Sequence, residues 1–358
     1  MCALLALSSF AFTPSNSALG GPNPIMTPSI VVDASSSNVS ITGTHCDFLN
    51  STGSTFAATL VFCPINATSP STISYTFNGT GVDIFGSASS NTSFNYTLDG
   101  SSGQQVAVNA AQAGSSLWSI ADLPEGNHTL ALIPTSGNLT LDYFLSTPSN
   151  DTILDGVDLL YDDTDESMEY HGTWPFFVPP STVVGTPLNT TLHETRTKGD
   201  GIFFRFVGSH IAIYGALNQK AGNLSTMFDV DREEPQTLQI FDGTQEVKED
   251  QWEFNHLLFE QDVDPGEHVL TLVVEEVTGD QAFYLDYIVT RGINITMLES
   301  PQSDFSQKFP EPTASSYIGI MMVGAMALAI IACLIKSKLT SRQIQRRAGK
   351  GLLPPMKV

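Results

Sequence analysis

The chain has 358 residues, of which 37 are Asp or Glu and 15 are Lys or Arg, so its formal net charge is −22. All 37 acids and 8 of the basic residues precede residue 336, and the other 7 basic residues lie in residues 336–358. The first part, with a net charge of −29, is repelled by phosphate backbones, which excludes nucleic acid as its partner.

The N-terminal residues are typical of a secretory signal peptide. Met1 to Phe12 is apolar and is followed by small and polar residues, with a candidate cleavage site near Ala18, so we assign residues 1–18 to this signal. No basic residue precedes the apolar stretch, so a start that has lost its first residues is the alternative.

The next region contains an internal repeat. Shifted by 129 residues, Ile73–Gly86 aligns with Ile202–Gly215, and we expect this offset to hold without a gap from Asp33 onward. Two later blocks align in the same order at shifts of 140 and 144. We infer two copies of one domain, at residues 30–147 and 154–291, each large enough to fold alone.

Both copies have the patterns of β-strands. Phe94, Tyr96 and Leu98 alternate with polar residues, and Ile202–Val207 is an apolar run bounded by glycines. Asn78–Gly81 resembles a hairpin turn. No helical period is sustained before residue 317. The sequence therefore predicts an all-β ectodomain of two tandem antiparallel β-sandwiches with a jelly-roll or similar topology.

Two polar positions recur in both copies. His128 and His268 follow a turn glycine, and we expect each to be a hydrogen-bonded structural residue. Asp142 and Asp286 lie within strands, where Asp is disfavoured, so we expect each to accept hydrogen bonds from the backbone of a neighbouring loop.

Cys46 and Cys63 are the only cysteine pair outside the two terminal apolar segments. A secreted domain matures in an oxidising compartment, so we predict a disulfide between them, worth about 3 kcal/mol in the chain-entropy model. The Asn-x-Ser/Thr pattern occurs at 12 of the 17 Asn, and we predict N-glycosylation in this group: Asn38, Asn50, Asn66, Asn78, Asn91, Asn95, Asn127, Asn138, Asn150, Asn189, Asn223 and Asn294.

The second copy carries the candidate ligand residues. Trp174, with Tyr161 and Tyr170 nearby, is a candidate platform for sugar rings, because an aromatic face is flat and apolar. The alternative is that Trp174 packs an edge of the sandwich or an inter-domain contact.

The same copy has an acidic string. Asp162, Asp163 and Asp165 offer oxygen ligands to a structural calcium ion, although the spacing of an EF-hand is absent. The alternative is a solvated acidic turn closed by local hydrogen bonds. We expect no other cofactor.

These motifs carry a family resemblance. Tyr161–Asp165 and Met168–Trp174, followed by Phe204–Gly208 and Leu285–Tyr287, resemble the tandem galactose-binding-like jelly-roll ectodomains of single-pass membrane proteins in mushroom-forming fungi. The resemblance covers about residues 30–292 and the layout of the C-terminal end. It implies the fold, the membrane topology and a glycan- or surface-binding role. The first copy departs from the pattern, with Ala34-Ser-Ser in place of the acidic string and His45 at the position of Trp174.

Common enzyme motifs are absent. The chain has no Gly-x-Ser-x-Gly elbow, His-Glu-x-x-His, P-loop or Cys-x-x-Cys, and we therefore expect that it is not an enzyme. Glycoside hydrolysis needs two carboxylates at a suitable distance in space. Such a pair has no local sequence motif, so the sequence leaves this activity open.

The C-terminal part predicts a membrane anchor. Residues 292–316 have the composition of a stalk, and Tyr317–Ile335 is a 19-residue apolar run, which as a helix spans about 28 Å. Residues 336–358 form a basic tail, which places this end in the cytoplasm next to anionic inner-leaflet lipids.

Together these features predict a type I glycoprotein of the plasma membrane or another secretory-pathway membrane, which binds glycan or cell-wall polysaccharide. The alternatives are a surface spacer without a small ligand and a diverged glycoside hydrolase.

Overall fold

The computed structural model describes residues 28–43, 46–50, 55–64, 70–180, 183–248 and 251–294. These residues belong to one of two units of the chain, Met1–Glu299, and the other unit is Ser300–Val358. The predicted signal peptide, apolar run, basic tail and nearly all of the stalk lie outside the described residues. Within the described ranges, no helix is long and apolar enough to cross a membrane.

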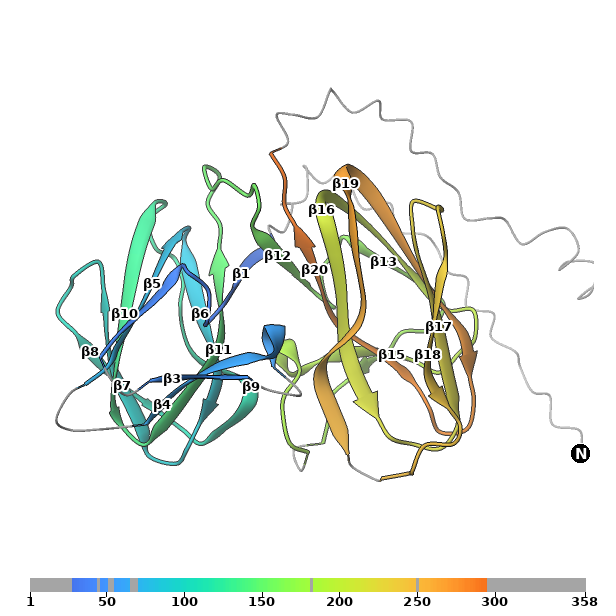
Figure 1. Cartoon of the computed structure of the whole chain (residues 1–358), viewed down its shortest axis with the longest axis horizontal. Helices are drawn as coiled ribbons and strands as arrows, with labels where there is room; N and C mark the ends of the chain where they lie inside the picture. The colour runs from blue at the N-terminus through green and yellow to red at the C-terminus, as the bar shows by residue number, and fades with distance from the viewer. Residues whose placement is uncertain are drawn as a thin grey trace, which may run out of the picture. The chain divides into compact units, whose positions relative to one another are not determined.

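The described residues form strands joined by turns, as the sequence predicted (Figure 1). Two single 3₁₀ turns interrupt them, η1 (Phe56–Ala58) and η2 (Leu188–Thr190). The strands are β1 (Ser29–Asp33), β2 (Val39–Thr42), β3 (Asp47–Asn50), β4 (Thr59–Pro64), β5 (Thr72–Asn78), β6 (Gly81–Ala88), β7 (Thr92–Leu98), β8 (Gln104–Val108), β9 (Ala111–Ile120), β10 (Asn127–Ser136), β11 (Asn138–Thr147), β12 (Asp158–Asp162), β13 (Met168–His171), β14 (Phe176–Phe177), β15 (Leu192–Thr195), β16 (Gly201–Asn218), β17 (Asn223–Val230), β18 (Gln236–Asp242), β19 (Trp252–Val277) and β20 (Phe283–Arg291).

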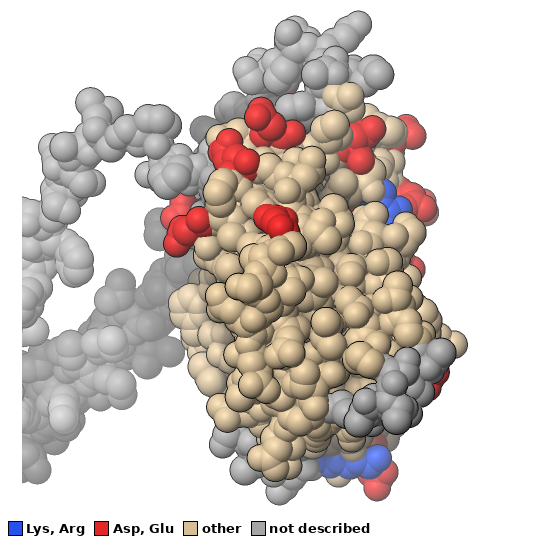
Figure 2. Space-filling view, turned by 90° about the vertical axis from the view of Figure 1, so that its left-hand side faces the viewer, with Lys and Arg blue, Asp and Glu red and all other residues tan. Residues whose placement is uncertain are grey.

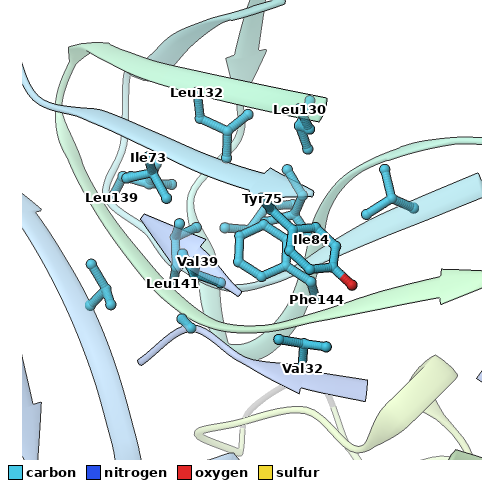
Figure 3. Close-up of a cluster of buried hydrophobic side chains, with 14 of the residues drawn as sticks. Val32, Val39, Ile73, Tyr75, Ile84, Leu130, Leu132, Leu139, Leu141 and Phe144 are labelled. Carbon is cyan, nitrogen blue, oxygen red and sulfur yellow. The ribbon is translucent and has the colours of Figure 1, made fainter. Parts of the chain in front are cut away.

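The first copy is an antiparallel β-sandwich. One layer is the sheet β2-β5-β10-β7-β8, and the other contains β1, β11, β4 and β3 together with β6 and β9. Apolar side chains from both layers meet between them, as Figure 3 shows for Ile73 and Leu130 of one layer and Ile84 and Phe144 of the other. Apolar and polar residues alternate along the strands because one face of each sheet is turned to the shared core.

The second copy is built around two long strands. β16 and β19 pair antiparallel from Gly201↔Val273 to Asn218↔Trp252, with register shifts at three β-bulges. The first half of β16 and the second half of β19 cover one side of the core, and the second half of β16 and the first half of β19 cover the other, so that Phe204, Ile213 and Leu272 are all fully buried. The bulges bend the strands, which lets one pair of strands serve both layers.

The expected hairpin turn at Asn78–Gly81 is not formed. β5 pairs with β2 and β10, whereas β6 pairs with β9 and β11, so the connection carries the chain from one layer to the other. Gly79 lies against the backbone of Thr147, where a Cβ atom would come within 2.1 Å of the carbonyl oxygen. The glycine is therefore needed for close packing at this crossing.

The repeat is visible in the fold, but its offset is not constant. Asp162 of β12 pairs with Tyr287, and Asp33 of β1 pairs with Tyr143 in the same way. Asp33 and Asp162 are therefore equivalent, and their separation is the predicted offset of 129 residues. Between the turns η1 and η2 the offset is 132, because Leu188 is equivalent to Phe56. An insertion of three residues precedes η2, and gap-free alignment of the sequence misplaces the strand that follows it.

The recurring Asp pair has the predicted role. The Oδ1 atom of Asp142 accepts a hydrogen bond of 3.0 Å from the backbone N–H of Phe56, and Asp286 accepts one of 3.0 Å from Leu188. Each carboxylate thus fixes the start of a 3₁₀ turn whose second residue has a positive φ. Burial raises the pKa of Asp142 to about 8 and that of Asp286 well above its ordinary value.

The recurring His pair is also structural. His128 bonds through Nδ1 to Asp99 (2.7 Å) and donates through Nε2 to the carbonyl of Pro124 (2.7 Å). His268 makes the same two contacts with Asp231 and Asp264, each at 2.6 Å. The hydrogen bond to Asp99 raises the pKa of His128.

The two copies share one sheet. β1 of the first copy pairs with β12 of the second, with Ser29 opposite Leu160 and Ile30 opposite Leu159, so a single path of strands runs through both copies (Figure 1). An apolar cluster that includes Val31, Tyr143 and Tyr287 packs at this junction. The sequence predicted two sandwiches, but it gave no sign of this pairing.

The predicted disulfide is confirmed, since Cys46 and Cys63 are bonded with their Cα atoms 4.2 Å apart.

The sequons remain predictions, and the structure divides them by exposure. Figure 2 shows that the face of the first copy carrying β8 is mostly uncharged, with its acids gathered at one end. Eight sequon asparagines are exposed, while Asn78, Asn95 and Asn223 are half-buried and Asn66 lies outside the described residues.

Candidate functional site

A cleft of about 770 Å³ opens where the two copies meet. The first copy contributes residues from β1 and from the turn η1, and the second contributes residues from β12, β16, β19 and β20. Its size falls in the range of small-ligand sites. The lining that carries chemistry consists of Asp33, Phe56, Asp158, His210, Tyr214, Glu253, Asn255, His256, Glu260 and Arg291.

Aromatic side chains form the floor of the cleft. Tyr214 stacks on Tyr287 with ring centroids 4.8 Å apart and lies 6.0 Å from Phe56. Burial, with a further contribution from the Glu260 and Asp158 carboxylates, raises the pKa of Tyr214 to about 12. The phenol is therefore neutral at physiological pH, and its hydroxyl makes no hydrogen bond within the described part of the chain.

Local structure places Tyr214 at this floor. The register shift between Ile213 and Tyr214 leaves Leu258 of β19 as an extra residue opposite them, so a bulge of the neighbouring strand lies beside Tyr214 and twists the pairing there. The next residue, Gly215, lies against the backbone of Tyr284, where a Cβ atom would meet the carbonyl oxygen at 2.1 Å. The close approach requires glycine at position 215.

Paired charges form one part of the rim. Arg291 donates from Nε and Nη2 to the two carboxylate oxygens of Asp158, at 2.9 and 3.3 Å, and this contact raises the pKa of Arg291. Glu253 and His256 are joined at 2.8 Å. These pairs fix the orientation of both donors and acceptors around the opening.

Two further acids lie at the rim. Asp33 accepts hydrogen bonds from the hydroxyl of Thr59 at 2.6 Å and from the backbone N–H and hydroxyl of Ser35 at 2.6 and 2.5 Å, so little of its acceptor capacity is left. Glu260 is exposed, and among the described residues it has no ion-pair partner. The cleft thus joins an apolar floor to a polar rim rich in carboxylate oxygens.

The residues predicted to stack on sugar lie elsewhere. Trp174 is half-buried, donates from Nε1 to the carbonyl of His171 (3.0 Å), and packs against Tyr170 and Phe283 at 5.4 and 6.0 Å. Tyr161 packs edge-on against Phe204 at the second core. The structure therefore brings Trp174 and Tyr170 together, but it places Tyr161 apart and uses the indole N–H within the fold.

The acidic string does not form the expected calcium site. Asp162 accepts from Thr164, Asp163 bonds to His193 at 2.8 Å, and Asp165 accepts from the backbone and hydroxyl of Ser167 at 2.8 and 2.6 Å. Each carboxylate has a different protein partner. Across the described ranges, no three His, Cys, Asp or Glu side chains are grouped to hold a metal ion. The predicted calcium site is corrected on this ground.

The sequence analysis missed Tyr214, although the repeat contains a signal for it. The equivalent pair in the first copy is Phe85 stacked on Tyr143 at 4.7 Å. A buried Phe of one copy is thus replaced by a half-buried Tyr in the other, and the added hydroxyl lies in the cleft. A comparison of the two copies position by position would have identified this change.

No family model matches the chain. Over 217 residues, or 60% of its length, it is 26% identical to a protein of Flavonifractor plautii named A type blood alpha-D-galactosamine galactosaminidase. The aligned part is 18% of that protein, so the chain spans less than a fifth of this relative.

Solved structures with some similarity include a Paenibacillus xanthan lyase (15% identity, 78% of this chain and 28% of that chain, TM-score 0.27) and the tandem CBM22-1-CBM22-2 domain of Paenibacillus barcinonensis Xyn10C (14% identity, 77% and 99%, TM-score 0.24). A two-domain esterase active on acetylated mannans matches with 17% identity, 42% and 41% coverage and a TM-score of 0.28. At TM-scores this low the likeness carries no argument about function.

The expectation that the chain is not an enzyme is contradicted by the sequence match, because the relative is named for a galactosaminidase activity. The physical reason for the error is that glycoside hydrolysis depends on two carboxylates placed by the fold, so missing sequence motifs do not exclude it. The resemblance to fungal membrane proteins is not tested by these matches and stays a prediction.

Proposed function

We propose that this chain is a carbohydrate-active protein that holds a sugar in the cleft between its two β-sandwiches. The observation that supports this most directly is the half-buried Tyr214, whose uncommitted hydroxyl lies on an aromatic floor below a rim of carboxylates.

The chemistry of the cleft fits a sugar ring. The C–H face of a pyranose is apolar and packs on aromatic rings such as Tyr214 and Phe56. Its hydroxyls donate to carboxylate oxygens, which Glu260 supplies, and accept from the guanidinium of Arg291. A flat apolar floor with convergent polar groups is the usual composition of a small-molecule site.

A second candidate function is hydrolysis of a terminal amino-sugar glycoside, favoured by the name of the bacterial relative. Asp158 and Glu260 line the same cleft as Tyr214, and both carboxylates contribute to the raised pKa of its phenol. Two carboxyl groups around one sugar are the catalytic requirement of most glycoside hydrolases.

Membrane anchoring, attraction of the tail to inner-leaflet lipids and a cell-surface location stay predictions from the sequence. If the anchor is present, the ligand is a glycan or wall polysaccharide outside the cell.

The test is calorimetric titration of the full-length chain with trisaccharides that end in galactosamine, N-acetylgalactosamine or galactose. We expect saturable binding that Tyr214→Ala weakens about tenfold, the size of an aromatic contact. The matched control is Tyr96→Ala, since Tyr96 is a half-buried tyrosine of the first copy that packs on Trp118, outside the cleft. Equal binding by both variants would contradict the proposal. Release of the terminal sugar, lost in Glu260→Gln, would establish the second function.

A further inference from the structure

The second copy contains a buried Asp–His pair that the cleft does not use. Asp163 is fully buried, and its Oδ2 atom lies 2.8 Å from Nδ1 of His193. A carboxylate can only accept, so Nδ1 carries a proton, and in the neutral form of the imidazole Nε2 is an acceptor. Within the described residues Nε2 has no hydrogen-bond partner, and it is not among the buried polar atoms that lack one.

Two aromatic rings enclose the imidazole. Tyr170 stacks on the imidazole, with ring centroids 4.4 Å apart and an interplanar angle of 25°, and the ring of Phe176 packs against it at 4.3 Å and 45°. Trp174 backs Tyr170, and the hydroxyl of Tyr170 donates to the carbonyl of Asp163 at 2.6 Å. The imidazole is therefore held in one orientation by a hydrogen bond and by rings.

Phe176 is exposed, although a neighbouring phenylalanine is not. The side chain of Phe176 is 63% exposed, whereas Phe177 packs on Trp252 at 5.3 Å. Phe176 lies on β14, directly opposite His193 on β15, and alternation along the strand turns it outward. A large exposed ring beside an oriented acceptor contributes little to the core.

The first copy makes the same strands without these groups. Ala34 is equivalent to Asp163, since each donates its backbone N–H to the paired carbonyl of Asp142 or Asp286. Val61 is equivalent to His193, because they pair with Leu141 and Leu285. Both apolar residues are buried, so the fold does not require an Asp–His pair at this position.

We propose that Phe176 and His193 form a second carbohydrate site on this edge of the second sandwich. The apolar face of a sugar ring packs on Phe176, and one sugar hydroxyl donates to Nε2 of His193. Asp163 is a positioning residue that fixes the tautomer. The ligand class rests on the proposed function, whereas the location is independent of the cleft.

The test is a calorimetric titration of the full-length chain with methyl α-D-galactopyranoside as the probe. Calorimetry should give two sugars per chain. Phe176→Ala should remove one of them, and Tyr214→Ala should weaken binding of the other about tenfold. The matched control is Phe48→Ala, because Phe48 of the first copy is 60% exposed. Phe176→Tyr keeps the ring and should keep both sites.

A spectroscopic measurement separates a binding role from a structural one. Long-range ¹H–¹⁵N spectra should show the Nε2 resonance of His193 moving on sugar addition in the wild type and in Tyr214→Ala, but not in Phe176→Ala. One site per chain that only Tyr214→Ala weakens, with an unmoved His193 resonance, overturns this second site and leaves the cleft proposal intact. No sugar bound by the wild type overturns both proposals.

Discussion

Asp142 and Asp286 occupy equivalent places in the two copies, and each carboxylate accepts a 3.0 Å hydrogen bond from the first residue of a 3₁₀ turn. The second carboxylate oxygen of each is buried, and among the residues that the structure describes it has no hydrogen-bond partner. The Asp142 turn supplies Phe56 to the cleft, so a buried acid of the core determines the shape of the candidate site.

Asp142 should make the fold less stable as the pH rises. Its pKa of about 8 in the folded chain exceeds the unfolded value near 4, so its contribution to stability is fully present below about pH 4 and is lost as the pH rises through 8. Asp142→Asn keeps an acceptor for Phe56 but cannot ionise. We expect it to gain up to about 5 kcal/mol over the wild type between pH 4 and 9, measured by urea unfolding. A difference that does not change with pH would refute this assignment.

His128 should change the stability of the fold over a different pH range. Its pKa is raised above 6.5 by the hydrogen bond to Asp99, so its stabilisation is complete below about pH 6.5 and is lost as the pH rises through the folded pKa. Asp99 is half-exposed, so we expect His128→Gln to cost less than about 1 kcal/mol at pH 5.5 and less still at pH 8.5. An NMR titration of His128 gives the folded pKa directly, and a value below 6.5 would contradict this account.

Gly215→Ala should disturb both the fold and the cleft. The new methyl group would meet the backbone of Tyr284, which cannot shift easily, and we expect a loss of about 3 kcal/mol. Gly266→Ala is the control, because its Cβ atom would have its nearest neighbour at 3.4 Å, the end of the His268 side chain. Thermal unfolding of the two variants should differ clearly, and equal melting temperatures would show that the backbone relaxes.

Reduction should weaken the first copy. The bond between Cys46 and Cys63 closes a loop of moderate length, so its removal should cost about 3 kcal/mol. Cys46→Ser, which leaves the buried Cys63 in place, should unfold at the same denaturant concentration as the reduced wild type. If reduction leaves the wild-type midpoint unchanged, the loop is already restricted by other contacts.

Glycosylation should follow exposure and hydrogen bonding. The side-chain nitrogen of Asn78 donates to Asn127 at 3.2 Å, and that of Asn223 donates to Glu276 at 3.0 Å. A glycan replaces one of the two hydrogens on this nitrogen and must fit beside its half-buried hydrogen bond, so we expect these two sites to be empty and exposed Asn38 and Asn91 to be occupied. Glycopeptide mass spectrometry of the secreted chain measures the occupancy at each site.

The sequence predicted features that depend on nearby residues or on the repeat. Strand patterns, the Cys46–Cys63 bond and the role of Asp142 all follow from residue type and from comparison of the two copies. The cleft could not be predicted, because it depends on the pairing of β1 with β12, and a strand's own pattern does not name its partner. The Asp163–His193 pair was missed for a related reason, since the three-residue insertion before η2 misaligns His193 with the first copy.

The pairing of β1 with β12 has a consequence for the chain as a whole. Each of these strands would otherwise end its sheet with a row of unpaired N–H and C=O groups, which is a template for the addition of another chain. Joined, they protect one another, and the duplication closes two potential aggregation sites. Either copy expressed without the other would therefore expose an unpaired strand edge. We expect the separated halves to self-associate through that edge.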